Sequence, residues 1–411
     1  MLRTSPVRAM IVRPGGDGRV DRRSVTDDEP NDSVIEIPAG LEQESTVVSV
    51  GRTMNRRTLL RTVGWVAAAA AAGVAVVEIV RRGTSSTVGV VTEALSFRRP
   101  SSPAPALAAG IHPNLVGLAP AVTPNADFFQ IDTSMAAPDI DTGTWAFTID
   151  GRVDHPLTLT YAELLALPSI ERHITLACVS NDVGGDLVGT ARWQGVRLSD
   201  LLKQVGVRAD ADAVVGVSVD GFTAGFPLAV LADGRDAMVA YAMNGEPLPA
   251  KHGFPARLVV PGLYGYVSAT KWLSQIRLTT LADDVPFWLG RGWSADGTVE
   301  AASRIDVPRD GVAVATGRVD VGGRAWHQHA AVGTVEISVD GGDWQRVTLA
   351  DSMGTDCWRL WSWSWDAAVG THELRVRMID DNGTLQDAAE RPTFPGAASG
   401  LHTIKVDVRP S

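Results

Sequence analysis

Cys178 is the residue of this sequence best placed to do metal or redox chemistry. It follows the apolar, strand-like residues 174–177 and precedes polar residues and the pair Gly184-Gly185. A cysteine at the point where a buried strand opens into a glycine-rich loop can present a thiolate to a metal or a cofactor. The alternatives are an inert buried cysteine and a disulfide with Cys357, the other cysteine of the chain.

A basic cluster further along the chain could bind an oxyanion. His252, Arg257 and Lys271 stand on either side of the hydrophobic run 258–260. Arginine suits bidentate contact with an oxyanion, lysine supplies a point charge, and loop amides add further donors. The pattern predicts a phosphate-binding loop, with solvated surface charges as the ordinary alternative. The small residues of this loop are Gly262, Gly265, Ser268 and Thr270.

Two adjacent aromatic residues, Phe128 and Phe129, stand among polar residues between Asn125 and Thr133. Aromatics in such a polar setting are a third candidate site. Two core aromatics beside a loop are the more common meaning of this pattern.

Short strands and two short helices are expected to position these residues. Residues 145–150, 214–219 and 257–260 have strand patterns. Thr160, with Glu163 three residues later, predicts a capped helix that reaches Leu167, and residues 199–205 repeat this pattern behind Ser199. Because no glycine fingerprint of a dinucleotide-binding unit occurs, the domain is predicted to be α+β with mainly antiparallel strands.

The last hundred residues predict a second, all-β domain that begins at about residue 300. Five segments alternate apolar and polar residues, which is typical of a β-sandwich. Asp340-Gly341-Gly342 separates two of them as a hairpin turn does. Trp361, Trp363 and Trp365 alternate by two and share one strand face, where core or interface packing is favoured over a binding platform. The segments are 312–321, 334–339, 344–349, 372–379 and 402–408.

Residues 54–82 resemble an export signal. Arg56-Arg57 and then Arg61 precede an apolar run from Val63 to Val80, a twin-arginine arrangement. A buried helix of a soluble domain is the ordinary alternative for this run. Otherwise the run is long enough to serve either as a cleaved signal or as a retained transmembrane anchor. Either outcome places the protein on the extracytoplasmic side of the cell membrane. Because twin-arginine export carries folded proteins, it also favours a cofactor enzyme.

Two further segments are expected to lie outside the folded domains. Residues 1–53 are polar and are predicted to be a disordered extension, with Met54 as an alternative start of translation. Residues 83–120, rich in Ser, Pro, Ala and Gly, are predicted to be a linker.

The composition excludes several classes of protein. With 45% hydrophobic and 20% charged residues, the chain is expected to be globular rather than disordered. A net charge of −10 argues against a nucleic-acid binder held by phosphate contacts. Two cysteines are too few for a disulfide framework, a zinc ribbon or an iron–sulfur cluster. No Cys-x-x-Cys-His occurs, so no haem is expected in this chain.

Five motifs in order resemble the sulfite oxidase family of molybdopterin enzymes. The likeness implies a molybdopterin-binding oxidoreductase domain over residues 121–299 and an immunoglobulin-like dimerisation domain over residues 300–411. It implies a molybdenum–molybdopterin cofactor, oxygen-atom transfer, an external electron carrier and a homodimer. The motifs are Phe128-Phe129, Cys178-x-x-Asn181, Ala191-Arg192-Trp193-x-Gly195-Val196, Met243-Asn244-Gly245-Glu246-Pro247-Leu248-Pro249, and His252-Gly253-Phe254-Pro255-x-Arg257, which runs on to Lys271-Trp272-Leu273.

The resemblance also implies roles for individual residues. Cys178 is the expected thiolate ligand of molybdenum, and a soft thiolate suits a metal already bound by dithiolene sulfurs. Arg192 and Trp193 match a motif beside the substrate pocket and are the expected catalytic partners. The residues expected to bind the pterin and its phosphate are Phe128, Phe129, Gln130, Ile131, Asp132, Asn181, Asp220, His252, Arg257, Ser268, Thr270 and Lys271.

The sequence departs from sulfite oxidases at a position that faces the substrate anion in that family, and in a second motif. The family has an arginine after the asparagine of Cys-x-x-Asn, where this chain has Asp182. The Arg and His that follow the paired aromatics in the family are Ile131 and Thr133 here. An aspartate repels sulfite, so a sulfoxide or another small molecule, reduced or oxidised, is an alternative substrate.

Three hypotheses follow. The leading one is an exported molybdopterin oxidoreductase. The second is an inactive envelope protein that binds a partner through its β-sandwich. It is suggested by Asp182, which stands where the family has an arginine. The third is a thiol–disulfide protein that uses Cys178 and Cys357.

Overall fold

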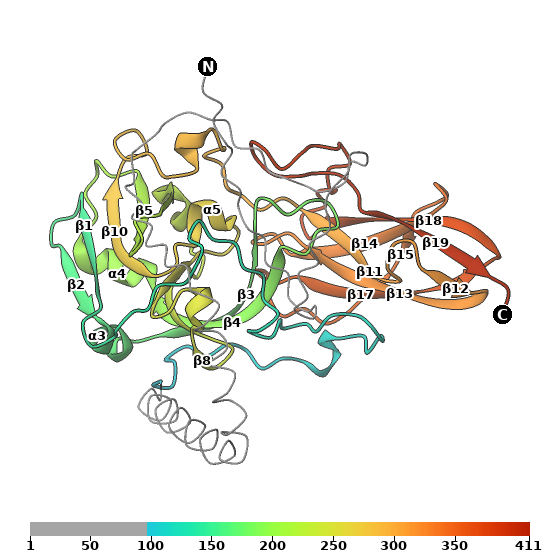
Figure 1. Ribbon diagram of the computed structural model, residues 1–411, viewed down its shortest axis with the longest axis horizontal. Helices are drawn as coiled ribbons and strands as arrows, with labels where there is room; N and C mark the ends of the chain where they lie inside the picture. Colours follow the sequence, from blue (N-terminus) through green and yellow to red (C-terminus); the bar gives the residue numbers. More distant parts are fainter. Residues whose placement is uncertain (1–96) are drawn as a thin grey trace, which may run out of the picture. The chain divides into compact units, whose positions relative to one another are not determined.

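The computed structural model describes residues 97–411 (Figure 1). The predicted disordered extension, the predicted signal or anchor and the first part of the predicted linker lie outside these residues. Within residues 97–411, no helix combines the length and the apolar character needed to cross a membrane.

One five-stranded sheet of the first domain has the order β2-β1-β10-β5-β6. β1 pairs in parallel with β10, although the paired residues Thr148 and Gln275 are far apart in sequence, and the other neighbours are antiparallel. The strands predicted at 145–150 and 214–219 are confirmed, each shifted by one residue. The strands are β1 (Ala146–Gly151), β2 (Leu157–Thr160), β5 (Ala213–Ser218), β6 (Thr223–Pro227) and β10 (Leu273–Thr279).

A second sheet, with the order β3-β4-β7-β8 and β9 paired to β7, carries Cys178 directly after the end of β3. Its central strands are almost wholly buried, and the strand over residues 238–243 is accordingly apolar throughout. The strands are β3 (Ile170–Ala177), β4 (Val188–Arg197), β7 (Met238–Met243), β8 (Glu246–Pro247) and β9 (Arg257–Val259).

The helices among residues 97–411 are short, so the first domain is mostly β and contains less helix than the predicted α+β class implies. α3 (Tyr161–Ala166) has the predicted capping box between Thr160 and Glu163. α4 (Leu198–Val205) begins before the predicted cap Ser199, because the backbone NH of Leu198 donates to Ala237 and replaces a side-chain cap. The remaining pieces are α5 (Gly265–Ser268), η1 (Ala109–Ile111), η2 (Leu228–Asp233), η3 (Ala250–His252) and η4 (Leu289–Arg291).

Two facing sheets form the predicted sandwich, with the orders β11-β13-β17-β16 and β12-β19-β18-β14-β15. The turn at Asp340-Gly341-Gly342 joins β14 to β15, as predicted. The strands are β11 (Ala302–Val307), β12 (Ala313–Ala315), β13 (Gly317–Trp326), β14 (Val332–Val339), β15 (Gln345–Arg346), β16 (Thr348–Leu349), β17 (Arg359–Ala367), β18 (Gly370–Asp380) and β19 (Thr403–Arg409).

The prediction of one continuous strand over residues 312–321 is wrong. β12 pairs with β19 in one sheet and β13 pairs with β17 in the other. The chain crosses between the sheets at Thr316, whose NH donates to Arg409 and whose hydroxyl donates to Ala367. Gly317 then takes a φ of 105°, which a residue with a side chain rarely adopts. Residues 344–349 divide between the two sheets in the same way, as β15 and β16.

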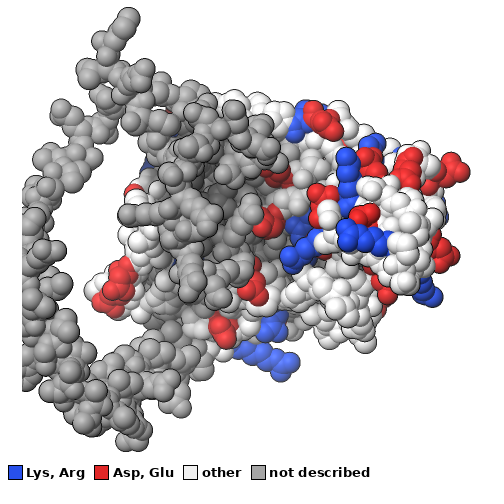
Figure 2. Space-filling view, turned by 45° about the vertical axis from the view of Figure 1, so that its right-hand side comes forward, with Lys and Arg blue, Asp and Glu red and all other residues white. Residues whose placement is uncertain are grey.

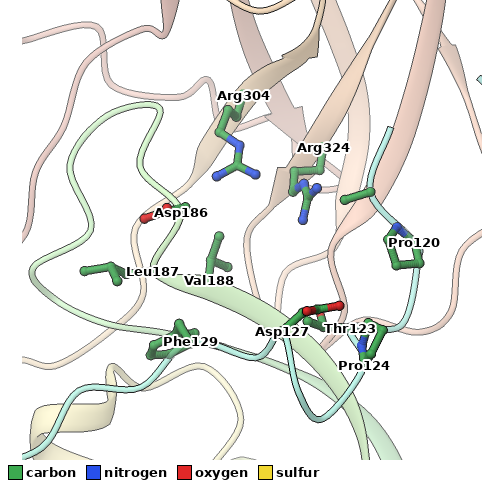
Figure 3. Close-up of a pocket in the computed structure, with 11 residues that line it drawn as sticks. Pro120, Thr123, Pro124, Asp127, Phe129, Asp186, Leu187, Val188, Arg304 and Arg324 are labelled. Atoms are coloured by element: carbon green, nitrogen blue, oxygen red, sulfur yellow. The ribbon is translucent and has the colours of Figure 1, made fainter. Parts of the chain in front are cut away.

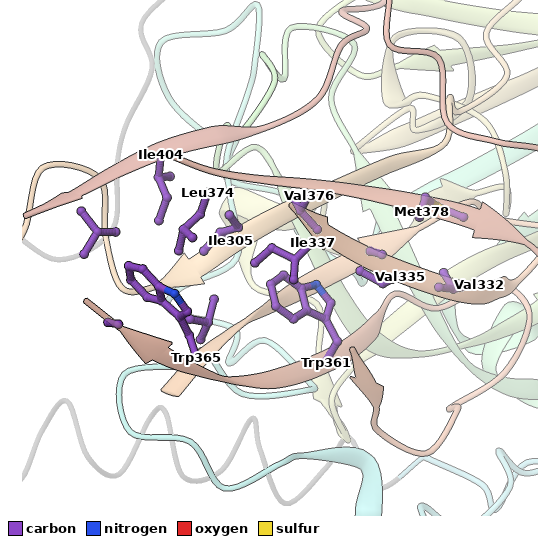
Figure 4. Packing of buried hydrophobic residues seen from close by; sticks show 14 of the residues in the cluster. Ile305, Val332, Val335, Ile337, Trp361, Trp365, Leu374, Val376, Met378 and Ile404 are labelled. Atoms are coloured by element: carbon purple, nitrogen blue, oxygen red, sulfur yellow. The ribbon is translucent and has the colours of Figure 1, made fainter. Parts of the chain in front are cut away.

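Trp361 and Trp365 lie in the core of the sandwich (Figure 4). Trp361 is completely buried, and Trp363 is partly buried against the same cluster. The alternating tryptophans therefore serve core packing, as predicted, rather than forming a binding platform.

The first domain and the sandwich are joined through the backbone and hydroxyl of Thr175 in β3. Its NH donates to Asp356, its carbonyl accepts from the side chain of Gln328, and its hydroxyl accepts from the NH of Trp358. Because Thr175 is fully buried, these bonds form in the absence of competing water.

The part of the predicted linker that the structure describes is fixed to both domains. Ser101 donates to Ser169 before β3, and Asp351 of the sandwich donates to Gly110. Leu118 packs into a small apolar cluster with Ala350 and Leu360. On the face shown in Figure 2, basic and acidic side chains are interspersed.

Candidate functional site

Cys178 is buried where β3 ends. Its backbone NH donates to Leu187, and its sulfur accepts from the NH of Ser180 at 3.4 Å. Burial raises the pKa of the Cys178 thiol, although this bond and the charge of Lys271 oppose the rise. The thiol is therefore neutral at pH 7, and a bound metal ion provides the means to deprotonate it.

Asn181 holds the loop after Cys178 closed. Its NH donates to the carbonyl of Cys178, and its side-chain oxygen accepts from the NH of Leu187 at 2.7 Å. Asn181 thus positions the cysteine. Asp182 lies exposed in this loop, and its carbonyl accepts from Gly185.

Arg257 is a buried cation at the start of β9. Its guanidinium donates to the carbonyls of His252, at 3.1 Å, and Leu258, and lies 5.1 Å from the ring of Trp193. Burial lowers the pKa of Arg257 to about 10, so it stays charged at pH 7. Among the described residues, no carboxylate forms an ion pair with it.

Lys271 reaches the same region from the other end of the loop. Its ammonium group donates to Asp132 at 2.7 Å and to the carbonyl of Lys251 at 3.0 Å. Burial lowers the pKa of Lys271 to about 8, with Asp132 opposing and Arg257 adding to the shift. Gly253 lets the two basic side chains approach, since a Cβ there would lie 3.1 Å from the Cβ of both Arg257 and Lys271.

His252 has one ring nitrogen engaged and one free. Nε2 donates to the carbonyl of Asn125 at 2.9 Å, whereas Nδ1 is buried and has no partner among the described residues. Burial lowers the pKa of His252 to about 3, and the neighbouring charges of Arg257 and Lys271 add to this shift. The neutral ring therefore offers Nδ1 as an acceptor for a donor of a ligand.

Phe128 and Trp193 form the apolar wall beside these groups. Phe128 packs edge-on against Trp193 at 5.7 Å and against His252 at 5.6 Å between ring centroids, and it stacks on Phe129 at 5.1 Å. Trp193 is completely buried, and its indole NH donates to Ile174.

Other predicted site residues contact neighbouring protein groups. The side chains of Arg192 and Trp193 point to opposite faces of β4, and Arg192 pairs with Glu171 at 3.3 Å. Asp220 is exposed in the β5–β6 turn, where it accepts from the NH of Phe222. Ser268 and Thr270 are buried and donate their hydroxyls to backbone carbonyls.

The three residues that follow Phe128 each make different contacts. Phe129 is half-buried and lines a pocket described below. The amide of Gln130 donates to Asp132 at 2.8 Å and steadies the carboxylate that holds Lys271. Ile131 contributes its carbonyl near the ammonium group of Lys271, at 3.5 Å.

The disulfide interpretation is contradicted, because Cys178 and Cys357 are both buried free cysteines. The thiol of Cys357 donates to the carbonyl of His173 at 3.0 Å. Burial raises the pKa of Cys357, with the charge of Asp356 adding to the rise, and so this thiol stays protonated.

Asn244 is a positioning residue to which the sequence assigned no role. Its amide group donates to Thr123 and Asn125, and its oxygen accepts from the NH of Arg192. It thereby ties the segment before Phe128 to β4 and fixes the carbonyl that His252 contacts. The Asn244-Gly245 turn, with a φ of 56° at Asn244, is the local signal that could have revealed it.

The chemistry of this donor set fits a molybdopterin cofactor. Arg257 and Lys271 carry two positive charges at pH 7 against the single carboxylate of Asp132, so the buried cluster has a surplus of one positive charge. A phosphate group neutralises such a cluster with charge-assisted hydrogen bonds. The free Nδ1 of His252 and the thiol of Cys178 add an acceptor and a soft metal ligand.

Comparison with known proteins agrees with this chemistry. Residues 134–287 match the family model described as "Oxidoreductase molybdopterin binding domain". Mitochondrial sulfite oxidase of Mus musculus is 31% identical over an aligned length of 341 residues, and the alignment covers 70% of this chain and 62% of that protein. The human enzyme matches equally well. The chain thus spans about 62% of the length of these curated relatives.

Two further relatives share the domain or the fold. The uncharacterized oxidoreductase YuiH of Bacillus subtilis is 37% identical over 158 residues, which cover 38% of this chain and 76% of YuiH. The crystal structure of the sulfane dehydrogenase SoxCD from Paracoccus pantotrophus superposes with a TM-score of 0.61 at 22% identity, covering 72% of this chain and 85% of that one. The chain therefore belongs to the sulfite oxidase family of molybdopterin-binding oxidoreductases.

Proposed function

We propose that this protein is a molybdenum cofactor-dependent oxidoreductase that catalyses oxygen-atom transfer on a small molecule outside the cytoplasm. The buried surplus of positive charge at Arg257 and Lys271, in the same domain as Cys178, carries the proposal. When bound, the cofactor supplies the redox chemistry and the oxo group. An external carrier, such as a cytochrome or a membrane redox partner, takes or delivers the electrons.

The proposed tasks of the protein residues are binding, orientation and exclusion of water. Cys178 binds the metal through its sulfur. Arg257 and Lys271 hold the phosphate, and His252 accepts a hydrogen bond from the pterin at Nδ1. Phe128 and Trp193 close the apolar side of the cofactor.

The proposed substrate is a sulfoxide-like or other small molecule rather than sulfite. Asp182 stands exposed in the loop after Cys178, where its negative charge opposes a dianion. Ile131 and Thr133 add no positive charge in their place. A screen of sulfite oxidation with an artificial acceptor, and of sulfoxide reduction with an artificial donor, tests this choice.

The first experiment is metal and pterin analysis of the full chain produced in a host that makes molybdopterin. We expect close to one molybdenum and one pterin per chain. Folded protein that contains neither would contradict the proposal and favour the alternative, an inactive envelope protein that binds a partner through its sandwich.

Export and dimerisation are separate parts of the proposal. The twin-arginine pattern supports export, and Arg56→Lys together with Arg57→Lys is expected to retain the protein in the cytoplasm. Light scattering on the purified protein tests the homodimer through the sandwich. A monomeric mass at micromolar protein concentration would contradict the homodimer and would leave the cofactor assignment unaffected.

A further inference from the structure

A pocket lies between the first domain and the sandwich. It has a volume of about 230 Å³, and neither Cys178 nor the buried basic residues of the cofactor site line it. Figure 3 shows the guanidinium groups of Arg304 and Arg324 on one side and Phe129, Leu187 and Val188 on the other. The pocket therefore combines a basic wall with an apolar wall.

The basic wall consists of two arginines placed side by side. Arg304 in β11 and Arg324 in β13 are direct partners in the strand register. Their side chains are 11% and 5% exposed. Like charges directly opposite each other on neighbouring strands are destabilising, and burial increases their repulsion.

One carboxylate, Asp306, offsets this repulsion in part. It accepts from Nε of Arg304 at 2.7 Å and from Nε of Arg324 at 2.8 Å, and it is itself 10% exposed. The three side chains together carry a net charge of +1. His402 adds no charge, because burial lowers its pKa to about 4.

The terminal nitrogens of the two arginines remain largely available. Nη1 of Arg304 donates to the carbonyl of Gly185, and the guanidinium of Arg324 lies 4.2 Å from the ring of Trp358. Among the described residues, neither Nη2 of Arg304 nor Nη1 or Nη2 of Arg324 donates a hydrogen bond. These donors suit bidentate contact with an oxyanion.

The rest of the lining limits what the anion can be. Phe129, Leu187 and two prolines, Pro120 and Pro124, offer an apolar surface to the body of a ligand. Asp127 and Asp186 are exposed lining residues, and they repel a ligand that carries a second negative charge.

We infer that this pocket binds a small organic monocarboxylate with an apolar body. The carboxylate contacts Arg304 and Arg324, and the body rests against Phe129 and Leu187. The inference concerns a ligand in addition to the cofactor and does not depend on which substrate the enzyme uses.

Calorimetric titration of the full, cofactor-loaded protein with benzoate tests the inference at low salt. Terephthalate, which has a second carboxylate, and inorganic sulfate are titrated in parallel. We expect benzoate to bind at least fivefold more tightly than either. Sulfate binding as tight as benzoate binding would overturn the organic ligand, and no benzoate binding at 10 mM would overturn the site.

Variants then assign the binding to the pocket. Arg304→Gln, which leaves Asp306 paired with Arg324, is expected to weaken benzoate binding at least tenfold. Asp186→Asn is expected to strengthen it about two- to fivefold, since it removes a repelling charge from an exposed position. Asp343→Asn, an exposed carboxylate outside the lining, is the matched control and leaves the affinity unchanged.

The exposed aspartate keeps the test decisive if Arg304→Gln does not fold. Benzoate affinity that is unchanged in Asp186→Asn, with Arg304→Gln either unchanged or unfolded, assigns the binding to another place, such as the basic cluster at Arg257, and contradicts the inference. Benzoate affinity that rises in Asp186→Asn and not in Asp343→Asn supports the pocket by itself.

Discussion

Burial shifts the pKa values of the side chains that surround the candidate cofactor site, and the effects of these shifts can be measured residue by residue. Cys178 is the clearest case, because its neutral thiol can serve as the proposed metal ligand only after it loses a proton. Cys178→Ser is expected to lose molybdenum and at least 99% of the oxidoreductase activity, with a melting temperature close to that of wild-type apoprotein. Cys357→Ser, at the second buried cysteine, is the matched control and is expected to keep the molybdenum and the activity.

The proposed contact of Lys271 with the cofactor phosphate is expected to make cofactor retention depend on pH. Its pKa is lowered to about 8, and a bound phosphate favours the charged amine, so the lysine must hold its proton for tight binding. Cofactor loss during dialysis is therefore expected to be faster at pH 9.5 than at pH 7. Pterin fluorescence measures the loss. Lys271→Met is expected to lose the cofactor equally fast at both pH values, and an unchanged pH dependence in this variant would contradict the role of Lys271.

His252 makes the folded protein sensitive to acid. Its pKa is about 3 in the folded state and 6.5 in the unfolded chain, so below pH 6.5 only the unfolded chain takes up this proton. The stabilising contribution of the neutral ring, on the order of a few kcal/mol, is present above pH 6.5 and is lost as the pH falls to 3. Urea unfolding at pH 7 and pH 5 should show a smaller difference for His252→Gln than for wild type. His155→Gln, at an exposed histidine, should match wild type.

At the scale of the elements, the loop from Asn181 to Leu187 sets the position of Cys178. Asn181→Ala removes the acceptor for the NH of Leu187 and is expected to lower the free energy of unfolding by about 1–2 kcal/mol. Molybdenum content should fall with it. Asn181→Asp keeps a side-chain oxygen and should restore most of the metal, whereas equal loss in both variants would contradict a positioning role.

Local sequence patterns correctly predicted those structural features that are formed by residues close together in the chain. The capping box at Thr160 and Glu163 and the hairpin turn at Asp340 involve residues within a few positions, and both were found. The division of residues 312–321 was not predicted, because alternation reports which face of a strand is buried and not which sheet the strand joins.

In the candidate site, too, the sequence predicted local features but not contacts between distant residues. Local motifs and the family resemblance identified Cys178, His252, Arg257 and Lys271. The structure adds what depends on distant partners, such as the contact of Lys271 with Asp132 and the free Nδ1 of His252. No local signal in the sequence reports these contacts, since the chain brings the partners together only on folding.

At the scale of the whole molecule, the buried hydrogen bonds of Thr175 are expected to couple the stability of the first domain to that of the sandwich. Thr175→Val removes the hydroxyl that accepts from Trp358 and is expected to lower the free energy of unfolding by about 2–3 kcal/mol, because a buried NH is left without a partner. Wild type should unfold in one calorimetric transition, and the variant in a broader one or in two. Thr371→Val, at an exposed threonine of β18, is the matched control. A single sharp transition at the wild-type temperature would contradict the coupling.

The place of β10 between β1 and β5 has a consequence for synthesis of the protein. The hairpin of β1 with β2 and the hairpin of β5 with β6 form from residues close in sequence, but β10 alone joins them into one sheet. On the ribosome, the two hairpins must wait with unpaired edges until Leu273–Thr279 has left the exit tunnel. Lys271 emerges just ahead of this strand. The complete cluster of His252, Arg257 and Lys271 and the closed sheet are therefore expected to form in the same late step. If this cluster holds molybdopterin as proposed, insertion of the cofactor follows the synthesis of nearly the whole first domain.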